Sequence, residues 1–229
     1  MKSTLRILIA CLALASAAWP QADSGALERV LSQMDAAAKT IHTTEANVVW
    51  DQYQKVINDT DTEKGRIYFR REGNETQMAV DFSEPDKKYV IYNAGKVQVY
   101  QPKIDQVNEY TAGKDRADVE SFLVLGFGGG GHELLKSYDV KYLGSENVSG
   151  TTTSKLELTP KSARFRNNIA RILLWIDPAK GTLLQQQLFE PSGDYRLAKY
   201  SDIQVNQKLP DSVFKLKTTG KTHFISPQN

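Results

Sequence analysis

The sequence predicts a mainly β protein with a few helices, built on one twisted antiparallel sheet of about ten strands. From residue 44 onward, apolar side chains alternate with polar ones over short segments, which is the period of a half-buried strand. Turn-forming residues, above all glycine, proline, asparagine and aspartate, separate these segments. A sheet of this size tends to curl, so we expect a concave face that side chains, helices or a ligand must fill.

Two amphipathic helices interrupt the strand pattern. Residues 26–38 place apolar side chains three and four positions apart, and residues 115–125 repeat this spacing in the middle of the chain. A glycine-rich run follows at 126–131, and residues 132–136 are expected to form a further short turn of helix. A short helix is marginal in water on its own, so both helices need a hydrophobic surface to cover.

The strands are expected in the order of a meander that the second helix divides. They are residues 44–57, 65–71, 75–83, 88–93, 96–101, 106–111, 138–144, 152–159, 169–177, 182–190 and 195–206. A C-terminal segment follows the last strand, and its apolar residues Val213, Phe214 and Leu216 are expected to close the domain.

The N-terminus has the pattern of a secretory signal peptide. Lys2 and Arg6 form a short positive region, residues 7–14 are apolar, and small residues follow. The apolar run is far shorter than the roughly 20 residues that cross a bilayer. We therefore expect residues 1–22 to be a cleaved signal peptide and 23–229 to be a single domain in the periplasm. The small-residue rule allows cleavage after Ala17, Ala18 or Ala22.

Cys11 is the only cysteine of the chain and lies inside the apolar run. The surrounding residues superficially resemble a lipidation site, but an apolar segment follows the cysteine where a polar tether is expected. The signal-peptide interpretation is therefore preferred. If Cys11 leaves with the peptide, the mature chain has no thiol, and so no disulfide and no thiolate metal site.

Composition and motifs exclude several classes of function. The formal net charge is +2, and removing Lys2 and Arg6 brings it to about zero, so no global field attracts nucleic acid. The three histidines, His42, His132 and His223, lie far apart, and none has a second ligand at metal-binding spacing. The chain lacks a G-x-S-x-G motif, and its acidic pairs lie in polar turns. We therefore expect no enzyme activity, no cofactor and no metal.

The glycines at 128–131 do not form a phosphate loop, because no Lys-Ser or Lys-Thr opens a helix after them. Two interpretations stay open for this run. It is either a flexible connector, since consecutive glycines have large conformational freedom, or a joint that lets the neighbouring helix swing off the sheet.

Apolar residues at alternating strand positions are the strongest positive signal. An ordinary core explains them by default, but the helices are few and short relative to such a sheet, which leaves an apolar concavity. The residues expected to line it are Trp50, Phe69, Met78, Val80, Phe82, Ile91, Val99, Leu158 and Leu174 on strands, with Phe122 and Leu123 on the second helix.

Several segments resemble the periplasmic lipoprotein carriers of the LolA type, in the right order over nearly the whole mature chain. They are residues 65–71 (GRIYFRR), 89–92, 95–102 (GKVQVYQP), 106–107 and 156–161 (LELTPK). The resemblance implies an unclosed antiparallel β-barrel with a helical lid over an apolar cavity. In such a cavity the acyl chains of outer-membrane lipoproteins are shielded between the two membranes. It also implies an inner-membrane release complex and an outer-membrane receptor as partners. We expect the chain to be a monomer.

The resemblance further implies a lid-closing role for Arg71. In the family, an arginine before a proline on the second strand hydrogen-bonds to the lid. Here Glu72 stands in the position of the proline, so Arg71 can instead pair with Glu72 or another carboxylate. An exposed arginine at a strand end is the alternative.

Two functional hypotheses follow. The first is a carrier for acylated lipoprotein or other lipid cargo. The second is a periplasmic sensor or regulatory module on the same fold, which binds a membrane protein partner through its lid helices.

Overall fold

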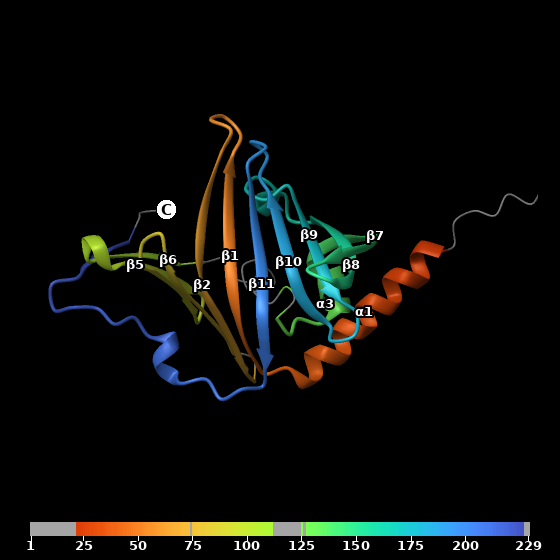
Figure 1. The fold of residues 1–229 in the computed structure, drawn as a ribbon, viewed down its shortest axis with the longest axis horizontal. Coiled ribbons are helices and arrows are strands. Elements are labelled where there is room, and N and C mark those ends of the chain that lie inside the picture. Colours follow the sequence, from red (N-terminus) through yellow and green to blue (C-terminus); the bar gives the residue numbers. More distant parts are fainter. Residues whose placement is uncertain (1–21, 74, 112–124, 126, 227–229) are drawn as a thin grey trace, which may run out of the picture.

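The computed structural model describes residues 22–73, 75–111, 125 and 127–226. Within them, twelve strands form one curved sheet (Figure 1). The first arm of the sheet contains β1 (Thr43–Gln54), β2 (Asp59–Glu72), β3 (Glu75–Glu84), β4 (Lys88–Asn93), β5 (Lys96–Gln101), β6 (Gln106–Thr111) and β12 (His223–Ile225). The second arm contains β7 (Tyr138–Val148), β8 (Thr151–Pro160), β9 (Arg171–Asp177), β10 (Thr182–Phe189) and β11 (Tyr195–Val205).

The two arms meet where β1 pairs with β11, although these strands come from opposite ends of the chain. The order across the sheet is β12-β6-β5-β4-β3-β2-β1-β11-β10-β9-β8-β7. The end strands β12 and β7 do not pair with each other, so the sheet is an unclosed barrel. Its inner, concave face and its outer face are therefore lined by alternate residues of every strand.

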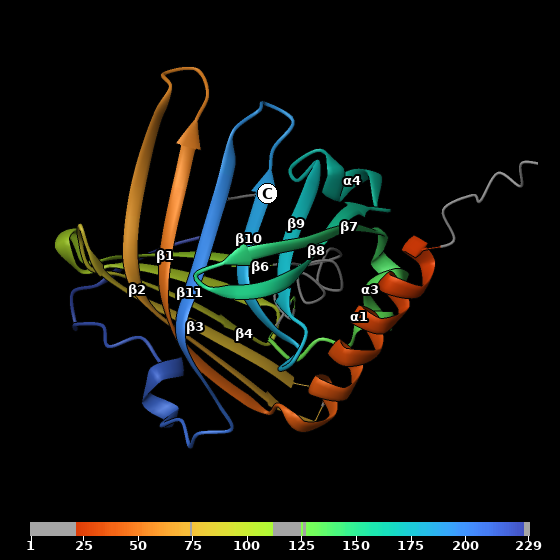
Figure 2. The ribbon, with the colours of Figure 1, turned by 45° about the vertical axis from the view of Figure 1, so that its right-hand side comes forward.

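The helices cover the inner face of the second arm. α1 (Ala22–Thr40) runs beside β7 and contacts α3 (Gly131–Ser137), as Figure 2 shows. Val30 and Met34 of α1 and Leu134 of α3 are buried in the main hydrophobic cluster. The single-turn helix α4 (Ala163–Arg166) joins β8 to β9, and Ser162 caps it by accepting from the backbone N–H of Phe165.

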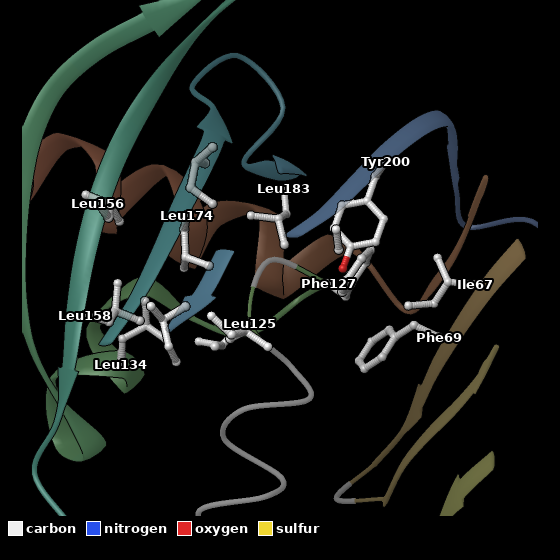
Figure 3. Packing of buried hydrophobic residues seen from close by; sticks show 14 of the residues in the cluster. Ile67, Phe69, Leu125, Phe127, Leu134, Leu156, Leu158, Leu174, Leu183 and Tyr200 are labelled. Atoms are coloured by element: carbon white, nitrogen blue, oxygen red, sulfur yellow. The ribbon is translucent and has the colours of Figure 1, made fainter. Parts of the chain in front are cut away.

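The main core lies between these helices and the strands of the second arm. Figure 3 shows Leu156, Leu158, Leu174 and Leu183 gathered on the inner face near Leu134. Leu125 and Phe127, from the segment before α3, lie between this group and Ile67, Phe69 and Tyr200 (Figure 3). The two residues therefore connect the packed interior of the second arm to the inner face of the first.

The C-terminal segment crosses the outer face of the first arm. Leu209 and Phe214, the latter in the 3-10 helix η3 (Asp211–Phe214), pack against Ala79 and Ile91. The chain then reaches the edge of the sheet, where β12 pairs with β6 in parallel. The carboxylate of Asp105, in the turn after the 3-10 helix η1 (Pro102–Ile104), accepts the hydroxyls of Thr219 and Thr222, each at 2.6 Å. We call residues 206–222 the C-terminal strap.

The predicted fold class is confirmed, with twelve strands instead of about ten. β2 begins at Asp59, whereas the sequence predicted a start at residue 65. The alternation could not reveal the first part of the strand, because residues 59–64 are mostly exposed and carry no apolar alternation. β12 has three exposed residues and no burial pattern to reveal it. The expected helix at 115–125 lies outside the described residues apart from Leu125, and so does the signal peptide apart from Ala22, where α1 begins.

Replacing Leu174 by alanine is expected to lower the free energy of unfolding by about 2–5 kcal/mol, because the side chain is fully buried and leaves a cavity. Urea denaturation checks this, with Leu143→Ala as the control. Leu143 is 48% exposed on β7, so its replacement is expected to cost less than about 0.5 kcal/mol. Equal costs for the two variants would contradict the assignment of the core to the second arm.

Candidate functional site

A cavity of about 580 Å³ lies on the inner face of the first arm. Its walls come mostly from β1 to β6, and β10, β11 and the segment before α3 complete it. The lining is mainly apolar and comprises Val48, Trp50, Gln52, Glu63, Ile67, Met78, Val80, Phe82, Lys88, Val90, Val99, Tyr110, Phe127, Gln186, Arg196 and Tyr200.

Strand register gathers these side chains. Trp50 of β1 lies opposite Glu63 of β2 and Ala198 of β11, and Val80 of β3 lies opposite Ile67 and Val90. Side chains directly across an antiparallel pair point to the same face, so each pairing extends one wall of the cavity. The structure places five of the predicted lining residues there: Trp50, Met78, Val80, Phe82 and Val99.

Phe127 closes one end of the cavity. Its ring stacks on Phe69 at 6.4 Å between centroids and meets Tyr200 edge-on at 4.9 Å. Phe69, which the sequence predicted as a lining residue, is buried on the far side of this contact and is not part of the wall.

Three other predicted lining residues lie elsewhere, and these predictions are corrected. Ile91 points to the outer face, because its neighbour Val90 faces the cavity and successive residues of a strand alternate. Leu158 and Leu174 do point to the inner face, but in the second arm, where the helices bury them completely. Phe122 and Leu123 lie outside the described residues.

Sequence reasoning left several lining residues unnamed. Val48 and Ile67 share the strand parity of Trp50 and Phe69, which were named, so the alternation itself could have identified them. Val90 lies beside Ile91 in an unbroken apolar run, where alternation does not separate the two faces. Phe127 lies between glycines and belongs to no periodic pattern, so no local signal marks it.

Polar groups gather at the end of the cavity opposite Phe127. Lys88 Nζ lies 2.5 and 2.6 Å from the two carboxylate oxygens of Glu63, and Gln52 Nε2 donates to Glu63 at 3.5 Å. Arg196, opposite Gln52 in register, pairs with Glu190 at 2.7 Å. Each cation has its own carboxylate, so this end is polar without a net charge.

One polar contact lies deeper in the cavity wall. Tyr200 donates its hydroxyl to Gln186 Oε1 at 3.5 Å, and both side chains are buried. Burial raises the pKa of Tyr200 far above its ordinary value, so the phenol stays neutral. The site therefore offers an apolar body, a neutral polar pair in its wall and a polar rim.

Arg71 ties the segment before α3 to the end of α1. Its Nη1 donates to the carbonyl of Gly128 at 2.7 Å, and its Nη2 donates to the carbonyls of Ile41, at 3.3 Å, and Ala38. Ala38 lies in the last turn of α1, where carbonyls lack helical partners and a cation is favourable. The carboxylate of Glu72 pairs with Arg70, at 3.6 Å, whereas the hydrogen bonds of the Arg71 guanidinium go to backbone carbonyls.

The described glycines of the run at 128–131 pack closely against the structure. Gly128 has a φ of +102°, and a Cβ on Gly131 would lie 2.2 Å from the carbonyl oxygen of Leu31. A side chain at Gly131 would therefore force α3 away from α1. These contacts favour a packing role for the glycines over a flexible connector, because the absence of side chains here allows two backbones to meet.

His132, at the start of α3, lies between two carboxylates of α1. Its Nε2 is 3.2 Å from Glu28 Oε2, its Nδ1 contacts Asp35 Oδ2, and its backbone N–H donates to Asp35 Oδ1 at 3.2 Å. Hydrogen bonds to Asp35 and then to Glu28 raise the pKa of His132. Partial burial raises the pKa of Asp35, but the hydrogen bonds from His132 outweigh it and leave that pKa lowered.

The contact of His132 is expected to make stability depend on pH. Because the pKa of folded His132 is raised, its stabilisation is fully present below the unfolded pKa of about 6.5 and is lost as the pH rises through the folded pKa. The lowered pKa of Asp35 keeps its own contribution present above about pH 4.

Melting temperatures of wild type and His132→Gln should therefore differ most near pH 5–6 and converge toward pH 9. The control is His223→Gln, which changes an exposed histidine on β12. A difference that stays constant across this pH range, or that the control shares, would contradict the assignment.

The described residues contain neither a cluster of metal ligands nor a membrane-spanning helix. No group of three or more His, Cys, Asp or Glu in this part of the chain is arranged to hold a metal ion. Among the same residues, none of the helices has the length and apolar character needed to cross a membrane.

An open curved sheet with an apolar cavity on its inner face and a helical cover beside it is the fold of the LolA-like class. The chain belongs to the family described as outer membrane lipoprotein carrier protein LolA, whose model matches residues 40–217. No curated protein sequence matches the chain significantly.

Solved structures share the fold at low sequence identity. An uncharacterized conserved protein from Thermus thermophilus matches with a TM-score of 0.55 and 11% identity, over 88% of this chain and 99% of that one. MucB matches with a TM-score of 0.52 and 13% identity, over 84% of this chain and 63% of MucB. The lipoprotein LppX from Mycobacterium tuberculosis matches with a TM-score of 0.48 and 12% identity, over 81% and 98%.

Proposed function

We propose that this protein is a periplasmic carrier that shields the acyl chains of lipoproteins, or of another lipid, during transfer toward the outer membrane. The observation that carries the proposal is the apolar cavity of about 580 Å³ on the inner face of the first arm. Its volume falls within the range of roughly 300–1,000 Å³ that is typical of ligand sites. Membership of the LolA family supports the same function.

The energetics suit a carrier. Each acyl methylene removed from water contributes about 0.8 kcal/mol, so ten of them contribute about 8 kcal/mol before the costs of association. Preformed walls lower those costs, because β1 to β5 need no reordering to receive a chain. The balance shields the cargo from water and still permits its release to a receptor that binds it more tightly.

The cover beside the cavity, which consists of α1, α3 and the segment before α3, is the proposed lid. Arg71 is the proposed lid-closing residue. Phe127 closes one end of the cavity, and the neighbouring Gly128 is held by the guanidinium of Arg71. Hydrogen bonds to three backbone carbonyls give a closed state that can open when a better contact competes.

The proposed location of the protein is inferred from its sequence, and its proposed partners are inferred from the family. The pattern of residues 1–22 supports export by a cleaved signal peptide, which delivers the domain to the periplasm. There the carrier is proposed to act as a monomer. By analogy with the family, an inner-membrane release complex supplies the cargo and an outer-membrane receptor accepts it.

Native mass spectrometry of the protein isolated from its own periplasm tests the carrier proposal. The expected result is a bound mass of an acylated lipoprotein or a lipid. A ligand-free protein that instead recovers a membrane protein in pulldowns would favour the sensor or regulatory module.

Filling the cavity is expected to weaken acyl binding. Val90 and Val99 lie opposite each other on β4 and β5, and both line the cavity. Val90→Trp/Val99→Trp should weaken the affinity for a fluorescent fatty acid at least tenfold, because the indoles occupy the space of the chain. The control is Gln98→Trp, which places an indole on the outer side of β5 and should leave the affinity unchanged. Equal affinities for all three proteins would count against the cavity as the binding site.

Removing the guanidinium of Arg71 is expected to open the cover. Arg71→Leu leaves three carbonyls without this donor, so the same fatty acid should enter several times faster in stopped-flow measurements. Arg70→Leu is the matched control, because Arg70 binds Asp211 and Gln77 away from the cavity. Unchanged entry in the Arg71 variant, or faster entry in both, would contradict the lid-closing role.

A further inference from the structure

The β1–β2 hairpin carries two exposed aliphatic side chains at its tip. Val56 is 95% exposed and Ile57 is 62% exposed, in the turn of residues 55–58. Figures 1 and 2 show this turn at the far end of a long hairpin that reaches beyond the neighbouring strands. Exposed turns favour glycine, asparagine and other polar residues, whereas valine and isoleucine favour half-buried strands. Local structure therefore gives no reason for this pair.

The tip is held in place by its neighbours. Asn58 has a φ of +50°, its N–H donates to the carbonyl of Lys55 at 3.3 Å, and its Oδ1 accepts the hydroxyl of Tyr53 at 2.9 Å. The Tyr53 ring stacks on Tyr195 of β11 at 4.8 Å. From the β10–β11 turn, Asp194 Oδ1 accepts the backbone N–H of Lys55 at 2.8 Å. A tip braced in this way loses little conformational entropy when it binds.

The tip also lies beyond the polar end of the cavity. Trp50 and Gln52 line the cavity on β1, and Val56 follows them along the same hairpin, away from Phe127. A surface that touches the tip therefore faces the end of the cavity that Phe127 does not close.

The size and charge of the tip favour a lipid bilayer as its partner. A stable protein interface buries about 800 Å² on each side, far more than two side chains supply, whereas a bilayer interface requires no shape complementarity. Asp59, Asp61 and Asp194 flank the tip together with Lys55, and the nearby cation of Arg196 is paired with Glu190. This charge gives no attraction to an anionic surface, so the contact must be apolar.

We propose that Val56 and Ile57 form a membrane-contact tip that inserts among the lipid head groups and holds the polar end of the cavity at the bilayer surface. The inference goes beyond the carrier function, because it names a surface outside the cavity and does not depend on which cargo the cavity takes. A tip at the bilayer shortens the path over which an acyl chain is exposed to water. The contact is reversible, insensitive to salt and not strengthened by anionic lipid.

Vesicle flotation tests the tip with the double variant Val56→Ser/Ile57→Ser. The probes are vesicles of phosphatidylcholine alone, and vesicles of phosphatidylethanolamine with phosphatidylglycerol. The protein is used in its exported form, with the N-terminus checked by mass spectrometry, because the apolar residues 7–14 would bind vesicles themselves. The variant should bind at least about fivefold less than wild type to both kinds of vesicle, since it loses apolar carbons from both side chains.

The matched control is Leu143→Ser/Ile225→Ser. It removes two exposed aliphatic side chains from β7 and β12, the end strands of the sheet, and should bind vesicles like wild type. Three outcomes overturn the proposal: wild type does not bind vesicles, the tip variant binds as well as wild type, or the control loses as much binding. Tip-dependent capture by a solubilised membrane protein without vesicle binding also overturns it, because the tip would then be a protein contact.

A fatty-acid titration on the same proteins separates this proposal from the carrier function. The tip variant should bind the soluble fatty acid as wild type does, because its cavity is unchanged. Failure of wild type to bind fatty acid would count against the carrier and leave the vesicle result to decide the tip.

Discussion

The cavity exists because the inner face of the open sheet is larger than the cover that packs on it. α1 and α3 bury Leu158 and Leu174 in the second arm, where packing is complete. In the first arm, Trp50 and Val90 on the same face line open space. The helices therefore bury the apolar inner face of the second arm, whereas part of the apolar inner face of the first arm stays uncovered. Burial of this surface by an apolar ligand would be favourable.

The cover is attached by contacts that differ in strength and kind. Gly131 meets Leu31 backbone to backbone, a contact that shape alone fixes. Arg71 and His132 add polar contacts to Gly128, Asp35 and Glu28 at partly exposed positions, where solvent screens them. An apolar core under one arm thus gives the protein its stability, while polar contacts near the cavity leave room for movement.

The alternation of apolar and polar residues predicted the strands well. It also predicted which side chains point to the inner face of the sheet, wherever the other side of the strand is polar. It failed for Ile91, because residues 89–92 form an unbroken apolar run with the cavity on one side and the C-terminal strap on the other. For Leu174 the predicted face was right, but a sequence does not say which arm its helices will cover. The contact of His132 with Asp35 joins residues 97 positions apart, so no local spacing announces it.

The strand β12, which follows the C-terminal strap, also changes what the first arm presents to other chains. Without β12, the backbone amides and carbonyls of β6 that point away from β5 would be exposed as a template for another strand. Three residues of β12 occupy part of that template, and the Asp105 contacts hold them in register. β12 thereby protects part of this edge against association with the edge strand of another copy, at the arm where the core contributes least.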